Sequence, residues 1–549
     1  MRGLMMDYPL TLSVFLARAE KLFPAREVVT RTSDGVHRTT YADIARRTRQ
    51  LASALERHGV APGERVASFA WNTFRHLELY FAVPCSGRVL HTLNIRLFPD
   101  QVIYIVNHAE DQVIFVDDNL VPVLETMKDH FATVKLYVVM GDGPLPETSL
   151  APVIRYEDFL AQGDPNYAWP ALDEDEAAMM CYTSGTTGHP KGVLYTHRAL
   201  FLHSLTQAAA DVCGLSERDT VLPVVPMFHA NSWGFPFTST LVGAKQVFPG
   251  PFMTPQAVLD LMQQEKVTVA AGVPTIWIGA APLIAQGSYD LSSIRDIYVG
   301  GSAVPASLLE AYDRLGLRIV QAWGMTETTP IGSVSKVKSS LAGLPADQVL
   351  RTRAKQGLPS LVVEARVANE VGEEVPWDGA TMGELQVRGP WVISGYYNDA
   401  RSPASFQDGW FRTGDVAVID AEGYIQLVDR TKDLVKSGGE WISTVELENA
   451  LMAYPKVLEA AVIAVPHARW QERPLACVVL KPGETATREE VLDFLRPRFA
   501  SWWLPDDVVF VPAIPKTSVG KFDKKVLRGE YQAYTLPDHG AHASTPDAD

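Results

Sequence analysis

Residues 182–193 read YTSGTTGHPKGV and place four aliphatic hydroxyl side chains and three glycines between two apolar stretches. Glycine leaves backbone N–H groups open to a ligand, and hydroxyl groups can donate to phosphate oxygens or ligate Mg²⁺. The Walker A pattern of P-loop kinases and ATPases ends in Gly-Lys-Ser/Thr, whereas Gly192 and Val193 follow Lys191 here. The stretch therefore predicts a phosphate-binding loop of another type; an ordinary turn between two elements is the alternative.

The composition limits the function classes that the chain can serve. Its 549 residues exceed what one hydrophobic core usually supports, which favours at least two domains. Its formal net charge of -15 argues against nucleic acid as a main partner, because such binding needs a basic surface. Four cysteines without metal-ligand spacing indicate neither zinc nor a disulfide framework, which favours a cytoplasmic location.

One stretch is long and apolar enough to raise the question of a membrane span. Residues 267–289 contain no charged side chain, but Pro274 and Pro282 interrupt them together with several glycines. Proline breaks a continuous helix, so a buried strand followed by a buried helix is expected instead. We therefore expect no transmembrane segment.

The rest of the chain alternates strand-like and helix-like segments. RVASFAW (65–71), QVIFVDD (112–118) and KLYVVMG (135–141) are typical of buried parallel strands covered by helices. A hairpin is expected near residues 416–429, followed by a compact α+β block with capping boxes at Ser443 and Thr487. The predicted fold is α/β, with a large N-terminal domain of parallel sheets and a β-rich subdomain (1–431), a small mobile α+β domain (432–530) and a disordered tail (531–549).

The opening loop and six further motifs together resemble the adenylate-forming enzymes, which include acyl-CoA synthetases, luciferases and the adenylation domains of peptide synthetases. The six motifs follow in the family's order: VPMFHANSWG (225–234), VGGSAVP (299–305), QAWGMTET (321–328), WFRTGD (410–415), DRTKDLVKSGGEWIS (429–443) and PKTSVGK (515–521). The residues of these motifs most resemble those of the medium- and long-chain fatty-acid–CoA ligases. The resemblance implies two steps: a fatty acid and ATP give acyl-AMP and pyrophosphate, and coenzyme A then displaces AMP.

The resemblance also implies which residues bind the nucleotide and its metal. Mg²⁺ would be ligated by Thr183 and Glu327, and both ligands are the oxygen donors that it prefers. Asp415 would accept hydrogen bonds from the ribose, with Arg430 as a second contact. The full set expected to contact ATP or AMP is Thr183, Ser184, Gly185, Thr186, Thr187, Gly188, Lys191, Gly301, Gln321, Ala322, Trp323, Thr326, Asp415, Arg430 and Lys432.

Further roles follow from the resemblance for residues of the catalytic lysine loop, the hinge and the path of the acyl group. Lys521 would stabilise the negative charge of the adenylation transition state, and Lys432 would be the pivot of the small domain. Trp233 would gate the acyl tunnel, and stretches 220–244 and 267–289 are candidates for its lining. The residues expected beside coenzyme A or the acyl group are His229, Trp233, Lys436 and Trp441.

Three alternatives remain open. The acid could be aromatic or otherwise not fatty, the acyl group could pass to a carrier protein, or the chain could bind a nucleotide or lipid without catalysis. The presence of Lys521, Glu327 and Asp415 argues against the last. A homodimer is expected from the long-chain ligases alone.

Overall fold

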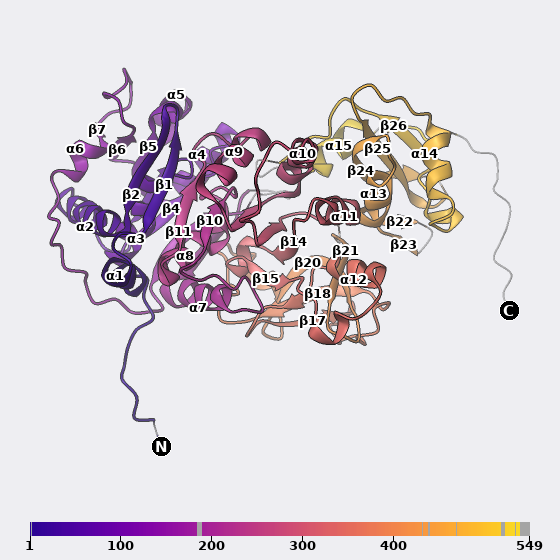
Figure 1. Ribbon diagram of the computed structural model, residues 1–549, viewed down its shortest axis with the longest axis horizontal. Helices are drawn as coiled ribbons and strands as arrows, with labels where there is room; N and C mark the ends of the chain where they lie inside the picture. The colour runs from indigo at the N-terminus through magenta and orange to yellow at the C-terminus, as the bar shows by residue number, and fades with distance from the viewer. Residues whose placement is uncertain are drawn as a thin grey trace.

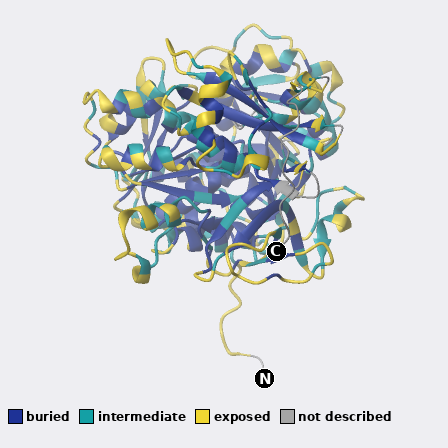
Figure 2. Ribbon diagram, turned by 90° about the vertical axis from the view of Figure 1, so that its right-hand side faces the viewer, coloured by how far each residue is buried: buried dark blue, intermediate teal, exposed yellow. Residues whose placement is uncertain are grey.

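The computed structural model describes residues 1, 3–183, 189–430, 432–437, 440–467, 469–517, 522–532 and 534–537; at 440 and 441 it describes the backbone alone. A large N-terminal part contains three sheets, and a smaller part that contains the last five β-strands of the described chain lies at one end (Figure 1). Most strands are buried, while the exposed residues lie mainly on the outer helices and loops (Figure 2).

The largest sheet has nine strands in the order β16-β15-β14-β13-β12-β10-β11-β1-β2. Neighbouring strands from β1 to β14 are parallel, and the outer strands β2, β15 and β16 are antiparallel to their neighbours. The strands are β1 (Glu27–Thr32), β2 (Gly35–Thr40), β10 (Thr220–Pro223), β11 (Lys245–Phe248), β12 (Val269–Gly272), β13 (Asp296–Gly300), β14 (Ile319–Gly324), β15 (Ile331–Val334) and β16 (Leu358–Pro359).

A second sheet has seven strands in the order β7-β6-β5-β3-β4-β8-β9, and only β9 is antiparallel. Its strands are β3 (Arg65–Phe69), β4 (Val89–Thr92), β5 (Asp111–Asp117), β6 (Leu136–Met140), β7 (Val153–Arg155), β8 (Ala177–Tyr182) and β9 (Gly192–Thr196). The parallel strands expected from the sequence at 65–71, 112–118 and 135–141 are β3, β5 and β6. The predicted α/β class is thereby confirmed.

Helices cover these two sheets and pack between them. One continuous core joins α2 and α3 to Met227, Phe237 and Phe248 from the other half of the domain. The helices are α1 (Ser13–Leu22), α2 (Tyr41–Arg57), α3 (Phe74–Cys85), α4 (Pro99–Ala109), α5 (Val121–Glu125), α6 (Tyr156–Leu160), α7 (His197–Ala208), α8 (Phe235–Val242), α9 (Pro255–Glu265), α10 (Pro274–Ala285), α11 (Ala306–Arg314) and α12 (Ala346–Arg353). Residues 267–289 form β12 and α10, as predicted.

A β-rich subdomain completes the N-terminal part. Its strands are β17 (Glu364–Ala368), β18 (Gly383–Arg388), β19 (Phe406–Gln407), β20 (Trp410–Ile419) and β21 (Ile425–Arg430), all in antiparallel pairs. β20 and β21 are the two strands of the predicted hairpin.

The small C-terminal part has a sheet of its own in the order β23-β22-β25-β24, with β26 beside β25. Ser443 and Thr487 cap α13 and α14 as the capping boxes predict, each accepting a hydrogen bond from the backbone N–H three residues later. The elements are β22 (Val435–Ser437), β23 (Glu440–Ile442), α13 (Thr444–Met452), β24 (Val457–His467), β25 (Gln471–Leu480), α14 (Arg488–Leu495), β26 (Asp507–Phe510) and α15 (Lys524–Glu530).

The packed part of the chain extends past residue 530. The Tyr534 hydroxyl donates to Asp507 Oδ2 at 2.6 Å, and Leu536 packs against the small-domain core. The expectation of disorder from residue 531 onward is wrong for this segment, because its aromatic side chains find an apolar surface; residues 538–549 lie outside the described part.

No helix in the described ranges is long and apolar enough to cross a membrane. The four cysteines are buried, and none is in a disulfide among the described residues.

Candidate active site

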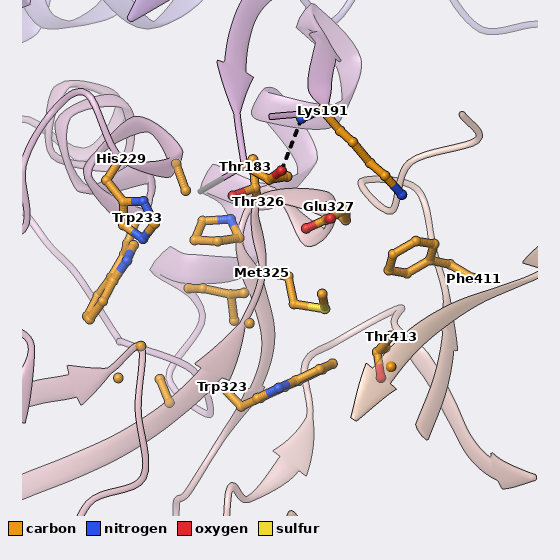
Figure 3. A pocket seen from close by; sticks show the side chains of 18 of the residues that line it. Thr183, Lys191, His229, Trp233, Trp323, Met325, Thr326, Glu327, Phe411 and Thr413 are labelled. Carbon is orange, nitrogen blue, oxygen red and sulfur yellow. Dashed lines mark hydrogen bonds between the residues drawn. The ribbon is translucent and has the colours of Figure 1, made fainter. Parts of the chain in front are cut away.

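A cavity of about 520 Å³ opens between the nine-stranded sheet, the loop that joins β8 to β9, and the β-rich subdomain. One side is polar and the other apolar, and Figure 3 shows Glu327 and Lys191 on one side with Trp233 and His229 on the other. The predicted site residues that line it are Thr183, Lys191, His229, Trp233, Gly301, Ala322, Trp323, Thr326, Glu327, Arg430 and Lys432. These residues come from five of the seven motifs, which the fold brings together around one cavity.

The strand pair β8 and β9 places both ends of the phosphate loop at the polar side. Because the two strands are antiparallel neighbours, Thr183 and Lys191 come together: the Lys191 N–H donates to Thr183 Oγ1 at 3.2 Å. The Thr183 N–H donates in turn to the Lys191 carbonyl at 3.0 Å. Ser184, Gly185, Thr186, Thr187 and Gly188 lie outside the described residues.

Glu327 lies on the same polar side, in a short turn between β14 and β15. It is buried, and its Oε1 accepts a hydrogen bond of 2.8 Å from the Tyr396 hydroxyl. Burial and the neighbouring Glu327 charge raise the pKa of Tyr396, which keeps the phenol protonated as the donor. The Tyr195 hydroxyl fixes the preceding residue by donating to the Thr326 carbonyl at 2.8 Å.

The oxygen atoms of Thr183 and Glu327 suit Mg²⁺, which takes one or two protein ligands and completes its shell with phosphate and water. Within the described ranges, no group of three or more His, Cys, Asp or Glu side chains forms a metal site. Thr183 and Glu327 fit a cation whose remaining ligands would be phosphate oxygens and water.

Asp415 on β20 is held by two partners. The Trp323 indole N–H donates to Asp415 Oδ2 at 3.0 Å, and Arg430 Nε lies 2.6 Å from Asp415 Oδ1. The negative charge of Asp415 is the main cause of the raised pKa of Arg430. Each carboxylate oxygen keeps a second lone pair, so the group can still accept from a ligand. Asp415 therefore holds Arg430 in place at the wall of the first cavity.

Asp415 and Gln321 do not line the first cavity but a second one of about 290 Å³, which shares Trp323, Arg430 and Lys432 with it. The Gln321 amide is used within the protein, since it accepts from the Val304 N–H at 3.1 Å and donates to the Ala354 carbonyl at 3.2 Å. Any contact between Gln321 and a nucleotide is therefore expected from its main chain.

The second cavity also reaches the small domain. Thr517 and Phe522, the described residues on either side of Lys521, line it together with Asp415. Lys521 itself lies outside the described residues. Thr517 and Phe522 therefore lie at the same cavity as Asp415.

A group of buried charges, which we call the junction cluster, joins the two parts of the chain here. It consists of Asp429, Thr444, Glu448 and Lys524. Lys524 Nζ lies 2.6 Å from Glu448 Oε1 and also donates a hydrogen bond to Thr444 Oγ1. The backbone N–H of Thr444 donates in turn to Asp429 Oδ2 at 2.7 Å. Burial raises the pKa of Glu448 to about 7 despite Lys524, and it raises that of Asp429 as well. Burial also lowers the pKa of Lys432, which lines both cavities.

Two residues predicted beside coenzyme A lie on a hairpin of the small domain. Lys436 on β22 pairs in register with Trp441 on β23, and Lys436 is not among the described residues that line the two cavities. The Trp441 side chain lies outside the described part of the structure.

Trp233 is carried by a left-handed turn, which we call the Ala230–Gly234 turn. All five of its residues have positive φ, from 42° at Ala230 to 78° at Gly234. Such a conformation costs roughly 1–2 kcal/mol for each residue other than glycine. Hydrogen bonds hold it: Ser232 Oγ donates to the Val225 carbonyl at 2.7 Å, and Gln207 Nε2 donates to the Trp233 carbonyl at 3.1 Å. Backbone strain of this kind is typical of functional sites.

The apolar side of the first cavity continues past Trp233. Its lining residues are Cys213, Ala230, Phe235, Tyr298, Ile331 and Val334. The first candidate stretch, 220–244, therefore contributes to this arm. The second, 267–289, does not: its residues Pro274, Thr275 and Ile278 line only the second cavity, because α10 lies on the side of the small domain.

Tyr396 is the main site residue that the motifs did not indicate. It lines the first cavity, and the Lys191 ammonium lies 4.3 Å from the centre of its ring. A tyrosine in the loop SGYYN (394–398) has no signal in one sequence that separates it from a packing residue.

Comparisons with known proteins agree with this geometry. The profile of the AMP-binding enzyme family matches residues 16–397, and that of the AMP-binding enzyme C-terminal domain matches residues 446–521. A long-chain-fatty-acid–CoA ligase of Thermus thermophilus is 51% identical over 96% of this chain and 97% of its own. A medium-chain-fatty-acid–CoA ligase of Ectopseudomonas oleovorans is 44% identical over 97% of this chain and 98% of its own.

Among solved structures, the anthranilate CoA ligase AuaEII in complex with anthranoyl-AMP superposes with a TM-score of 0.85 at 25% identity. The superposition covers 96% of this chain and 98% of that one. The likeness thus extends over both parts of the fold.

Proposed function

Because the chain belongs to the family of AMP-binding enzymes, we propose that it is an AMP-forming ligase that joins a medium- or long-chain fatty acid to coenzyme A. The observation that carries this proposal is the first cavity, which combines Thr183, Lys191 and Glu327 on one side with an apolar arm behind Trp233 on the other. A nucleotide needs the first kind of surface and an alkyl chain the second. The two similar ligases act on long-chain and medium-chain fatty acids, and the proposal includes both lengths.

In the first step a carboxylate oxygen of the fatty acid attacks the α-phosphorus of ATP, and the bond to the departing pyrophosphate breaks. Such a transfer needs positioning and charge neutralisation more than covalent help. Lys191 supplies positive charge at the polar side, while Asp415 and Arg430 orient the ribose. Mg²⁺, held by Thr183 and Glu327, would neutralise phosphate charge when bound. Lys521 would add a positive charge from the small domain.

The apolar arm would receive the alkyl chain and keep water from the mixed anhydride. Trp233 lines the cavity on the side away from Glu327 and Lys191 (Figure 3), and its indole would cover the reacting carboxylate. His229 lines the same cavity and would shape the carboxylate site; a fatty acid is already ionised at pH 7 and needs no general base.

In the second step the thiol of coenzyme A loses its proton, its sulfur attacks the acyl carbonyl carbon, and AMP leaves. The small domain would rotate between the steps about Lys432, which follows β21 at the boundary between the two parts. Lys436 and Trp441, opposite each other in the β22–β23 hairpin, would then face coenzyme A.

Pyrophosphate release with a panel of acids tests the proposal. Straight-chain acids of medium and long length should stimulate release far more than aromatic or two- to four-carbon acids, and coenzyme A should convert the adenylate to a thioester. Stimulation by an aromatic acid alone would reassign the substrate. Release without thioester would instead indicate a carrier protein as acceptor, and no release would leave a binding protein.

The homodimer expected from the long-chain ligases is proposed on the same basis. Light scattering behind size-exclusion chromatography tests it, with a mass of twice 60.3 kDa expected.

A further inference from the structure

Lys191 and Glu327 carry opposite charges and line the same side of one cavity. Figure 3 shows both side chains there, away from Trp233. Within the described ranges, no ion pair joins the two side chains. A direct pair would neutralise both groups before MgATP arrives, so something must keep them apart and aimed at different parts of the ligand.

Tyr396 contacts both groups in different ways. Its hydroxyl donates to Glu327 Oε1 at 2.8 Å, and its ring face lies 4.3 Å from the Lys191 ammonium. A hydrogen bond fixes the direction of a carboxylate, while a ring face attracts a cation through its quadrupole. One side chain therefore satisfies an acid and a base at separate places.

The loop around Tyr396 is itself fixed to the site. The Tyr396 N–H donates to Ser402 Oγ at 2.8 Å, and the Ile393 N–H donates to the Glu327 carbonyl at 3.0 Å. The ring also packs against two of the core clusters of the large domain. Because both its backbone and its ring are held, Tyr396 can impose a geometry on its two partners.

We infer that Tyr396 is a positioning residue for MgATP, which keeps Glu327 directed at the metal and Lys191 directed at the phosphates and prevents the two from pairing. The inference rests on the proposed function, since it assigns these partners to the metal and the nucleotide. Side chains that orient a metal ligand from outside the first coordination shell commonly change metal affinity about 10–100-fold when removed.

Two substitutions separate the two contacts. Tyr396→Phe removes the hydroxyl and keeps the ring, so the hydrogen bond to Glu327 is lost while the ring contact with Lys191 stays. Tyr396→Leu removes both and also frees Lys191. Tyr397→Phe is the matched control, because it makes the same chemical change at the adjacent position.

Calorimetric titration of the full-length protein with ATP, in Mg²⁺ and in EDTA, distinguishes them without measuring turnover. For Tyr396→Phe we expect about 10-fold weaker binding of ATP in Mg²⁺ and unchanged binding in EDTA. For Tyr396→Leu we expect weaker binding of ATP both in Mg²⁺ and in EDTA. The loss in EDTA should be about 2–5-fold relative to wild type, because the cation–π contact with Lys191 disappears. Tyr397→Phe should bind ATP as the wild type does in both conditions. The affinity for AMP should equal that of the wild type in every variant.

Equal dependence on Mg²⁺ in wild type and Tyr396→Phe would overturn this inference alone. So would weaker binding of AMP in Tyr396→Phe, because it would indicate general damage to the fold. A wild-type protein that binds no ATP would overturn the proposed function and the inference with it.

Discussion

The Ala230–Gly234 turn and the junction cluster are both buried, yet they are stabilised by opposite means. The turn is held by neutral hydrogen bonds from Ser232 and Gln207, and His203 packs against Gly234 so closely that a Cβ there would lie 2.6 Å from the imidazole. The junction cluster is held by an ammonium and two carboxylates.

This difference matches what each region has to do. Neutral contacts and steric fit define one geometry, which suits a wall that presents Trp233 to a substrate. Buried ions are costly to desolvate, and their mutual attraction roughly offsets that cost, which would suit a boundary that opens in the proposed rotation of the small domain. The comparison predicts that charge substitutions act mainly at the junction and volume changes mainly at the turn.

The largest effect is expected from breaking the charge balance of the junction. Lys524→Met leaves Glu448 and Asp429 buried without their cation, which should lower the free energy of unfolding by about 3–5 kcal/mol. Urea denaturation measures it. Lys525→Met, at an exposed neighbouring position, should stay within about 0.5 kcal/mol of wild type. Equal stability of the two variants would show that the cluster is not a buried ion pair in solution.

Next in size is the effect of Lys521 on the first half-reaction. Lys521→Ala should slow formation of acyl-AMP about 10²–10³-fold, because it removes charge stabilisation from the transition state. Thioester formation from supplied acyl-AMP and coenzyme A should change little, since that step does not build charge on the α-phosphate in the same way. An equal loss in both half-reactions contradicts this division.

Much of the fold follows from the sequence because its signals are local. Alternation of apolar runs marked β3, β5 and β6, and capping residues marked the starts of α13 and α14. The motifs also predicted eleven of the residues that line the first cavity. These features depend on neighbours in the chain, which a sequence displays directly.

The rest depends on contacts between distant segments. The sequence HANSWG does not reveal five successive positive φ values, which exist because Gln207 and Val225 hold the turn from other elements. Likewise, α10 is apolar enough for an acyl tunnel, but the topology places it on the side of the small domain. Tyr396 gains its partners only when residues 191 and 327 meet.

The smallest expected effect is a difference in pH dependence between the two regions. Burial lowers the pKa of His203 to about 3, so the turn loses stability as the pH falls below the ordinary value of 6.5. Burial raises the pKa of Glu448 from 4.5 to about 7, so the junction loses stability as the pH rises through that range. Titration of one such group changes the free energy of unfolding by at most about 1.4 kcal/mol per pH unit.

Hydrogen exchange read out by peptide separates the two regions. Between pH 5.5 and pH 8, after correction for intrinsic exchange rates, protection of residues 225–242 should rise and that of residues 444–452 should fall. Glu448→Gln should remove the second change and leave the first. The same direction of change in both segments would refute the comparison.

The central claim is that Trp233, presented by the turn, controls the acid. Trp233→Ala should leave ATP binding nearly intact, broaden or shift the chain-length profile of pyrophosphate release, and increase hydrolysis of acyl-AMP. These changes, found together with a melting temperature close to that of the wild type, would support the claim. Were Trp233 only a packing residue, the substitution would cost roughly 3–5 kcal/mol and reduce every activity together. A large fall in melting temperature with an unchanged chain-length profile would contradict the claim.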